Sequence, residues 1–142
     1  MVIGCLTNNL ENVINMKKKI LVVEDDDLNM RLIVDLLEAH GFETFQSKDG
    51  CKLIELARLK QPDLIIMDIM LPGITGFELI KSLKADEYLN GIPVLVVTAL
   101  ALSREKEIIK ESGCDEYISK PISILNFLNT VTHFINEPQR NQ

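Results

Sequence analysis

The stretch Leu64-Ile65-Ile66-Met67-Asp68 decides the fold, because it sets four consecutive apolar residues directly before a carboxylate. A continuous apolar run this short is typical of a parallel strand that helices cover on both faces. Four other short runs lie at 20–23, 42–46, 94–97 and 116–118, and amphipathic helical segments separate them. The alternation predicts an α/β domain of five βα units. Right-handed crossovers then require a doubly wound sheet with helices on both faces.

Side chains that cap helices mark where several helices begin. We expect Asp27 or Asn29 to cap the first helix and Asp49 to cap the second. Thr75 and Glu78 have the spacing of a capping box at the start of the third. The last helix is expected to run from near Ser123 to about 135 and to carry one apolar stripe: Ile124, Leu128, Val131 and Ile135.

Composition and charge exclude several classes of protein. The chain has 142 residues with a net charge of -6, which argues against general binding to nucleic acid. Its three cysteines fit neither a disulfide framework nor a zinc site. Reduced thiols in the cytoplasm are the simplest interpretation.

The expected domain covers residues 17–136. Residues 1–16 precede the first strand and are expected to be a disordered extension, and 137–142 form a C-terminal tail. No apolar run is long enough to span a bilayer, so we expect no membrane segment. The tail is too short for an output domain.

Polar side chains follow the strands at the edge where an open α/β sheet binds its ligands. Glu24 and Asp25 follow the first strand, Asp68 the third, Thr98 the fourth and Lys120 the fifth. Clustered carboxylates repel one another unless a cation neutralises them. Oxygen ligands at an open edge favour Mg²⁺. A metal and a lysine beside a carboxylate are suited to phosphoryl transfer, with Asp68 as the attacking group.

Four motifs together resemble the response-regulator receiver domains. They are Val23-Glu24-Asp25, Met67-Asp68-Ile69-Met70-Leu71-Pro72 with Gly76, Val97-Thr98-Ala99, and Ser119-Lys120-Pro121. Each motif alone is weak evidence, but all four occur in order on predicted strand ends, and the resemblance covers residues 17–136. It implies the flavodoxin-like or CheY-like fold, a parallel five-stranded sheet of order 2-1-3-4-5.

The resemblance also implies a role for each matching residue. Asp68 would accept the phosphoryl group, while Glu24, Asp25, Asp68 and the backbone carbonyl of Met70 would hold Mg²⁺. Lys120 would pair with the phosphoryl group, and its bond to Pro121 would be cis. Thr98 and Tyr117 would be the switch residues. Asp26 departs from the closest pattern, which often has Asn there, and its carboxylate would either tighten metal binding or face water.

The implied function is that of a single-domain response regulator in a phosphorelay. A sensor histidine kinase or a histidine phosphotransferase would be the donor, in control of cell division or the cell cycle. The signal would leave by protein contact, with the chain a monomer or weak dimer that binds no nucleic acid. Leu100, Leu102, Ile122 and Phe127 are candidates for the partner face.

Three alternatives remain at this level. The chain could be a receiver-fold adaptor that works without phosphorylation, although the complete set Asp25, Asp68, Thr98 and Lys120 argues against it. A phosphatase or phosphomutase would usually place a second acid two residues after the nucleophile, where Met70 stands. A flavin-binding domain would need a phosphate-binding loop after the first strand, and the acidic run there would repel phosphate.

Overall fold

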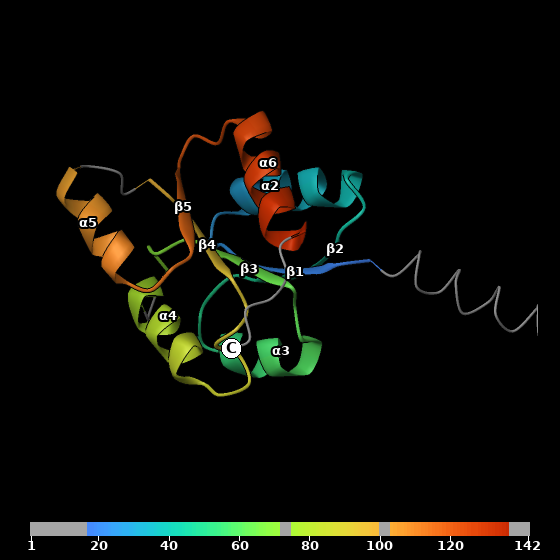
Figure 1. The fold of residues 1–142 in the computed structure, drawn as a ribbon. Coiled ribbons are helices and arrows are strands. Elements are labelled where there is room, and N and C mark those ends of the chain that lie inside the picture. The colour runs from blue at the N-terminus through green and yellow to red at the C-terminus, as the bar shows by residue number, and fades with distance from the viewer. Residues whose placement is uncertain (1–16, 72–74, 100–102, 137–142) are drawn as a thin grey trace, which may run out of the picture.

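Strands and helices alternate throughout the part of the chain that the computed structural model describes, which is residues 17–71, 75–99 and 103–136. The elements are β1 (Lys19–Val23), α2 (Asp27–Ala39), β2 (Glu43–Ser47), α3 (Leu53–Lys60), β3 (Leu64–Met67), α4 (Gly76–Ala85), β4 (Val94–Thr98), α5 (Ser103–Glu111), β5 (Glu116–Ser119) and α6 (Ile124–Asn136). All neighbouring strands pair in parallel, in the order β2-β1-β3-β4-β5. The predicted doubly wound sheet and its strand order are confirmed (Figure 1).

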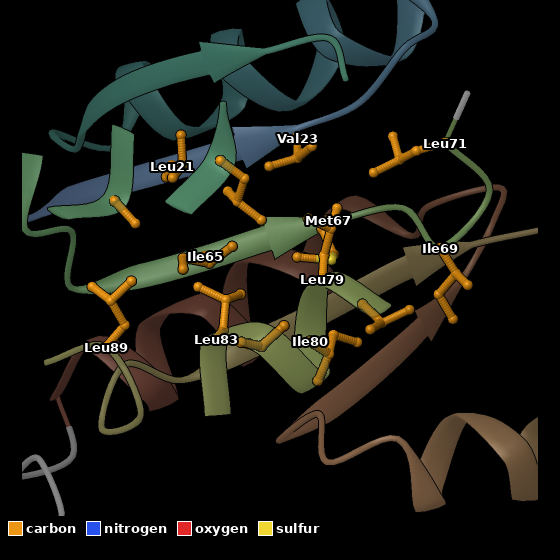
Figure 2. Close-up of a cluster of buried hydrophobic side chains, with 14 of the residues drawn as sticks. Leu21, Val23, Ile65, Met67, Ile69, Leu71, Leu79, Ile80, Leu83 and Leu89 are labelled. Atoms are coloured by element: carbon orange, nitrogen blue, oxygen red, sulfur yellow. The ribbon is translucent and has the colours of Figure 1, made fainter. Parts of the chain in front are cut away.

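The apolar strands are buried on both faces because helices lie on both sides of the sheet. In β3, Ile65 and Met67 belong to one core cluster and Leu64 and Ile66 to the other. The first cluster includes residues of α3, α4 and α5, and the second includes residues of α2 and α6. Figure 2 shows Leu79 and other residues of α4 directed toward β3. Each fully buried aliphatic side chain contributes about 1.5–3 kcal/mol, so the two cores dominate stability.

Asp26, and not Asp27 or Asn29, caps α2. Its carboxylate Oδ2 accepts the backbone N–H of Asn29 at 2.8 Å, and its own backbone is extended. At α4 the predicted cap is confirmed, since the hydroxyl of Thr75 accepts the backbone N–H of Glu78 at 3.3 Å.

The predicted cap of the second helix is also wrong. Asp49 lies in the preceding turn, where its carboxylate accepts the N–H of Cys51 at 3.0 Å. Helix α3 begins later, at Leu53, after Lys52, which makes no capping side-chain bond. The local Asp49 bond competes with helix formation, which explains the late start.

Helix α6 buries most of the expected stripe, since Val131 and Ile135 are buried and Leu128 is partly buried against the same core. Ile124, the first residue of the helix, is instead 53% exposed, and Phe127 is buried. Phe127 is fully buried and therefore belongs to the core, not to a partner face. Ile122 is partly buried against the same core. The candidates Leu100 and Leu102 lie outside the described residues.

Candidate functional site

Four strand ends carry the candidate residues to one edge of the sheet. Backbone bonds continue the ladder past the strands and fix each chain where it leaves the sheet. The N–H of Asp68 donates to the carbonyl of Val23 at 3.1 Å, and the N–H of Lys120 donates to that of Thr98 at 2.9 Å. These bonds set the direction of the side chains that follow β3 and β5. The bond between Lys120 and Pro121 is cis, as the resemblance implied.

Three carboxylates converge at this edge. Glu24, Asp25 and Asp68 each offer an oxygen, and these oxygens all lie within 4.8 Å of one another. Glu24 and Asp68 are only 2% and 6% exposed, whereas Asp25 is exposed. A compact set of carboxylate oxygens that is open on one side is the donor set that Mg²⁺ prefers. The residues present therefore fit the predicted ion.

Lys120 lies between the two buried carboxylates. Its Nζ donates to Asp68 Oδ2 at 2.8 Å and to Glu24 Oε1 at 2.7 Å. Burial alone would lower the pKa of Lys120, but the hydrogen bonds to Asp68 and Glu24 together outweigh it, and the pKa lies above its ordinary value. The ammonium therefore stays charged. The other oxygen of Asp68, Oδ1, accepts the backbone N–H of Met70 at 3.0 Å.

Burial is the main influence on Glu24. It raises the pKa of the Glu24 carboxyl above its ordinary value, although the hydrogen bond from Lys120 acts in the opposite direction. Sequence reasoning placed Glu24 beside the metal but did not predict its direct ion pair with Lys120, 96 residues away in the chain.

The acids after β1 have different partners. Asp27 forms an ion pair with Lys48 at 2.6 Å on the surface, and Asp26 caps α2. Neither belongs to the carboxylate cluster of Glu24, Asp25 and Asp68. The sequence left two interpretations open for the Asp26 carboxylate, tighter metal binding or exposure to water. This arrangement does not support tighter metal binding.

The two predicted switch residues lie on neighbouring strands. Thr98 ends β4, is fully buried and pairs in register with Ser119 of β5. Tyr117 is half-buried, in register with Val96. Met70 is 57% exposed at the rim. Their functional roles remain predictions.

The sequence pattern described as "Response regulator receiver domain" matches residues 20–132. This chain belongs to the response-regulator receiver family. It is 47% identical to the polar-differentiation response regulator DivK of Brucella ovis over 122 residues, which are 86% of this chain and 99% of that protein. The DivK of Brucella anthropi is 46% identical over 122 residues, which again are 86% of this chain and 99% of that protein.

Solved receiver structures have the same fold as this receiver domain. The chemotaxis response regulator CheY4 of Vibrio cholerae superposes with a TM-score of 0.77 at 25% identity, over 84% of this chain and 99% of that one. The receiver domain of a sensor histidine kinase from Pseudomonas aeruginosa superposes with a TM-score of 0.80 at 26% identity, over 86% and 100%. That structure is described with a magnesium ion coordinated in its active-site cleft.

Within the described residues, no helix of this receiver domain combines the length and apolar character needed to cross a bilayer.

Proposed function

We propose that this receiver domain accepts a phosphoryl group on Asp68 in a Mg²⁺-dependent reaction. The donor is a phosphohistidine of a sensor histidine kinase or a histidine phosphotransferase. An Asp68 carboxylate oxygen forms the new O–P bond as the P–N bond of the donor breaks, and the imidazole leaves with the electron pair. The buried Asp68 carboxylate with an ammonium 2.8 Å away is the observation that carries this proposal.

Each of the neighbouring groups has a task in this reaction. Glu24, Asp25, Asp68 and the backbone carbonyl of Met70 would hold Mg²⁺, which when bound neutralises charge on the phosphoryl oxygens. Lys120 already lies against Asp68 and supplies a second positive charge to the phosphoryl oxygens.

Thr98 and Tyr117 would transmit the modification. The Thr98 hydroxyl bonds the new phosphoryl group, and Tyr117 on the adjacent strand moves inward with it. The conformational equilibrium of the surface formed by α5, β5 and α6 then shifts from one of its two states toward the other.

The output is contact with another protein. The similarity to the polar-differentiation response regulator DivK supports a role in cell polarity. Within the same proposal, the domain acts in cell-division control as a single-domain cytoplasmic regulator that is a monomer or weak dimer. Exposed apolar residues at the start of α6, Ile124 at 53% and Leu125 at 72%, lie directly after the loop that carries Lys120. We assign them to the face that meets the phosphodonor, in place of the buried Phe127.

Phosphoryl acceptance can be tested with a small phosphodonor such as acetyl phosphate, in the presence of Mg²⁺ or EDTA. We expect wild type to be labelled only with Mg²⁺, and Asp68→Asn to remain unlabelled. The matched control is Asp27→Asn, which removes a carboxylate from the same edge but outside the cluster, and should be labelled like wild type. Labelling of Asp68→Asn at the wild-type level would reject the assignment. If neither wild type nor Asp68→Asn were labelled, the result would favour a receiver-fold adaptor that works without phosphorylation.

A further inference from the structure

We infer that Asp26 is a positioning residue for phosphoryl acceptance, because its backbone N–H holds Glu24 in the orientation that places Lys120 against Asp68. The inference rests on the proposed function of Asp68. It assigns Asp26 a role that neither its position among four consecutive acids nor the carboxylate cluster indicates.

Helix α2 immobilises the backbone of Asp26. Its side chain accepts the N–H of Asn29 at 2.8 Å, and its carbonyl accepts the N–H of Met30 at 2.9 Å. Met30 is buried in the core against the sheet. The cap therefore ties the backbone of Asp26 to a helix that cannot shift without disturbing the core.

Hydrogen bonds link this fixed backbone to the acceptor. The N–H of Asp26 donates to Glu24 Oε2 at 3.2 Å, while Glu24 Oε1 accepts from Lys120 Nζ at 2.7 Å. The same Nζ donates to Asp68 at 2.8 Å. Both oxygens of a carboxylate that is 2% exposed are thus engaged, one by the backbone and one by the catalytic lysine.

The neighbouring acids do not provide this restraint. Asp27 is paired with Lys48 on the surface, and Asp25 is exposed in the carboxylate cluster. A buried carboxylate oxygen that loses its donor is left unsatisfied, which is energetically costly. Loss of the Asp26 cap should therefore loosen Glu24 and, through it, Lys120.

Two substitutions separate the cap from the charge. Asp26→Asn removes the charge but keeps an oxygen that can accept the N–H of Asn29, whereas Asp26→Ala removes both. We expect Asp26→Asn to accept phosphoryl from acetyl phosphate at a rate close to wild type, and Asp26→Ala to be slower by about fivefold, the factor that corresponds to a typical cap. Asp27→Ala removes a neighbouring charge without this link and should leave the rate unchanged.

A second measurement does not depend on turnover. The two quantities are the amide hydrogen exchange of residue 26 and the affinity for Mg²⁺, measured by NMR titration with Mg²⁺ alone. Both should differ from wild type in Asp26→Ala and return to the wild-type values in Asp26→Asn. In a Glu24→Ala background, Asp26→Ala should have no additional effect on the rate, because the link is already broken. Equal rates for the Asn and Ala variants, or an undiminished Asp26→Ala effect in the Glu24→Ala background, would overturn the inference. If Asp68→Asn were labelled like wild type, the proposed function itself would be at fault.

Discussion

At Gly76 the backbone has no room for a side chain. A Cβ atom built there would lie 2.5 Å from the Cα of Ile69 and 3.0 Å from the carbonyl oxygen of Asp68. We expect Gly76→Ala to push the start of α4 away from the acceptor segment. It should lower the free energy of unfolding by about 1–3 kcal/mol, and also slow phosphoryl acceptance. Chemical denaturation and the rate of labelling by acetyl phosphate measure the two effects.

Gly41 provides the matched control for that substitution. It has a φ of +87°, but a Cβ atom there meets nothing within 4 Å. Gly41→Ala should cost about 1–2 kcal/mol through backbone strain alone and leave the labelling rate unchanged. If both alanine variants were labelled at the same rate, the contact between Gly76 and Ile69 would not control the site.

Among the described residues, Lys120 is the only cation that forms ion pairs with Glu24 and Asp68. Lys120→Met would leave two buried carboxylates together without it, and we expect the free energy of unfolding in Mg²⁺-free buffer at neutral pH to fall by about 3 kcal/mol. Added Mg²⁺ should restore part of this loss in the variant, because it replaces the missing positive charge. A variant as stable as wild type without Mg²⁺ would contradict the ion-pair argument.

The deficit of Lys120→Met should depend on pH. Burial already raises the pKa of Glu24, and removal of the lysine raises it further. A carboxyl whose pKa is raised in the folded state costs stability above that pKa, and the cost disappears below its unfolded value of about 4. The difference between wild type and variant, measured by urea denaturation, should therefore shrink as the pH falls from 7 toward 4.

At the scale of the elements, apolar periodicity predicted the strands well and the helix ends less well. The run 64–67 became β3 with the same bounds, because burial on both faces leaves few alternative registers. The cap of α2 was misplaced because four consecutive acids offer several chemically equivalent caps. Only the extended backbone of Asp26 distinguishes it, and that depends on where β1 ends.

Helix α6 shows a second limit of the pattern. Ile124 has the spacing of the buried stripe, but it precedes the point at which the helix reaches the sheet. Phe127, a candidate for the partner face on sequence grounds, fills that place in the core. Periodicity gives the buried side of a helix but not where along its length burial begins.

The ion pair between Arg58 and Asp86 joins α3 to the end of α4. Arg58 holds the pKa of the Asp86 carboxyl below its ordinary value, and the N–H of Tyr88, 2.8 Å from the same carboxylate, adds to this. A carboxyl with a lowered pKa stabilises the fold above its unfolded pKa of about 4, and this stabilisation is lost as the pH falls through the folded pKa. Asp86→Asn should therefore be less stable than wild type at pH 7, with the difference disappearing in acid.

Urea denaturation of both proteins between pH 7 and 2 measures this difference. Glu87→Gln makes the same change of charge at the adjacent exposed residue and should show little difference from wild type at any pH. A pH-independent deficit of Asp86→Asn would mean that Asp86 acts by packing and not by its charge.

At the scale of the whole molecule, the strand order determines which parts of the candidate site could be predicted. Residues at the ends of adjacent parallel strands must lie at one edge, so Glu24, Asp25, Asp68 and Lys120 could be grouped from the sequence. The particular contacts at that edge could not. The Lys120 ammonium donates to both Asp68 and Glu24, and the backbone N–H of Asp26 donates to the other Glu24 oxygen. These contacts depend on side-chain rotamers and burial, which the strand order does not determine.

The same architecture separates phosphoryl chemistry from recognition of the donor. Leu125 is 72% exposed on the first turn of α6, next to the loop that carries Lys120, and is not part of either core cluster. We expect Leu125→Asp to slow transfer from a partner histidine kinase or phosphotransferase by on the order of tenfold, since a buried apolar contact at such an interface is replaced by a charge. Labelling by acetyl phosphate, which needs no docking surface, should stay at the wild-type rate.

Leu59→Asp is the matched control, because Leu59 is similarly exposed, at 74%, but lies on α3, which packs on the opposite face of the sheet from α6. It should leave both reactions unchanged. The comparison is decisive because each variant serves as its own reference through the small donor. If Leu125→Asp slowed both reactions equally, the substitution would be disturbing Lys120 itself. If both variants slowed protein-mediated transfer equally, docking would be weakened by the added negative charge and not by the location of Leu125.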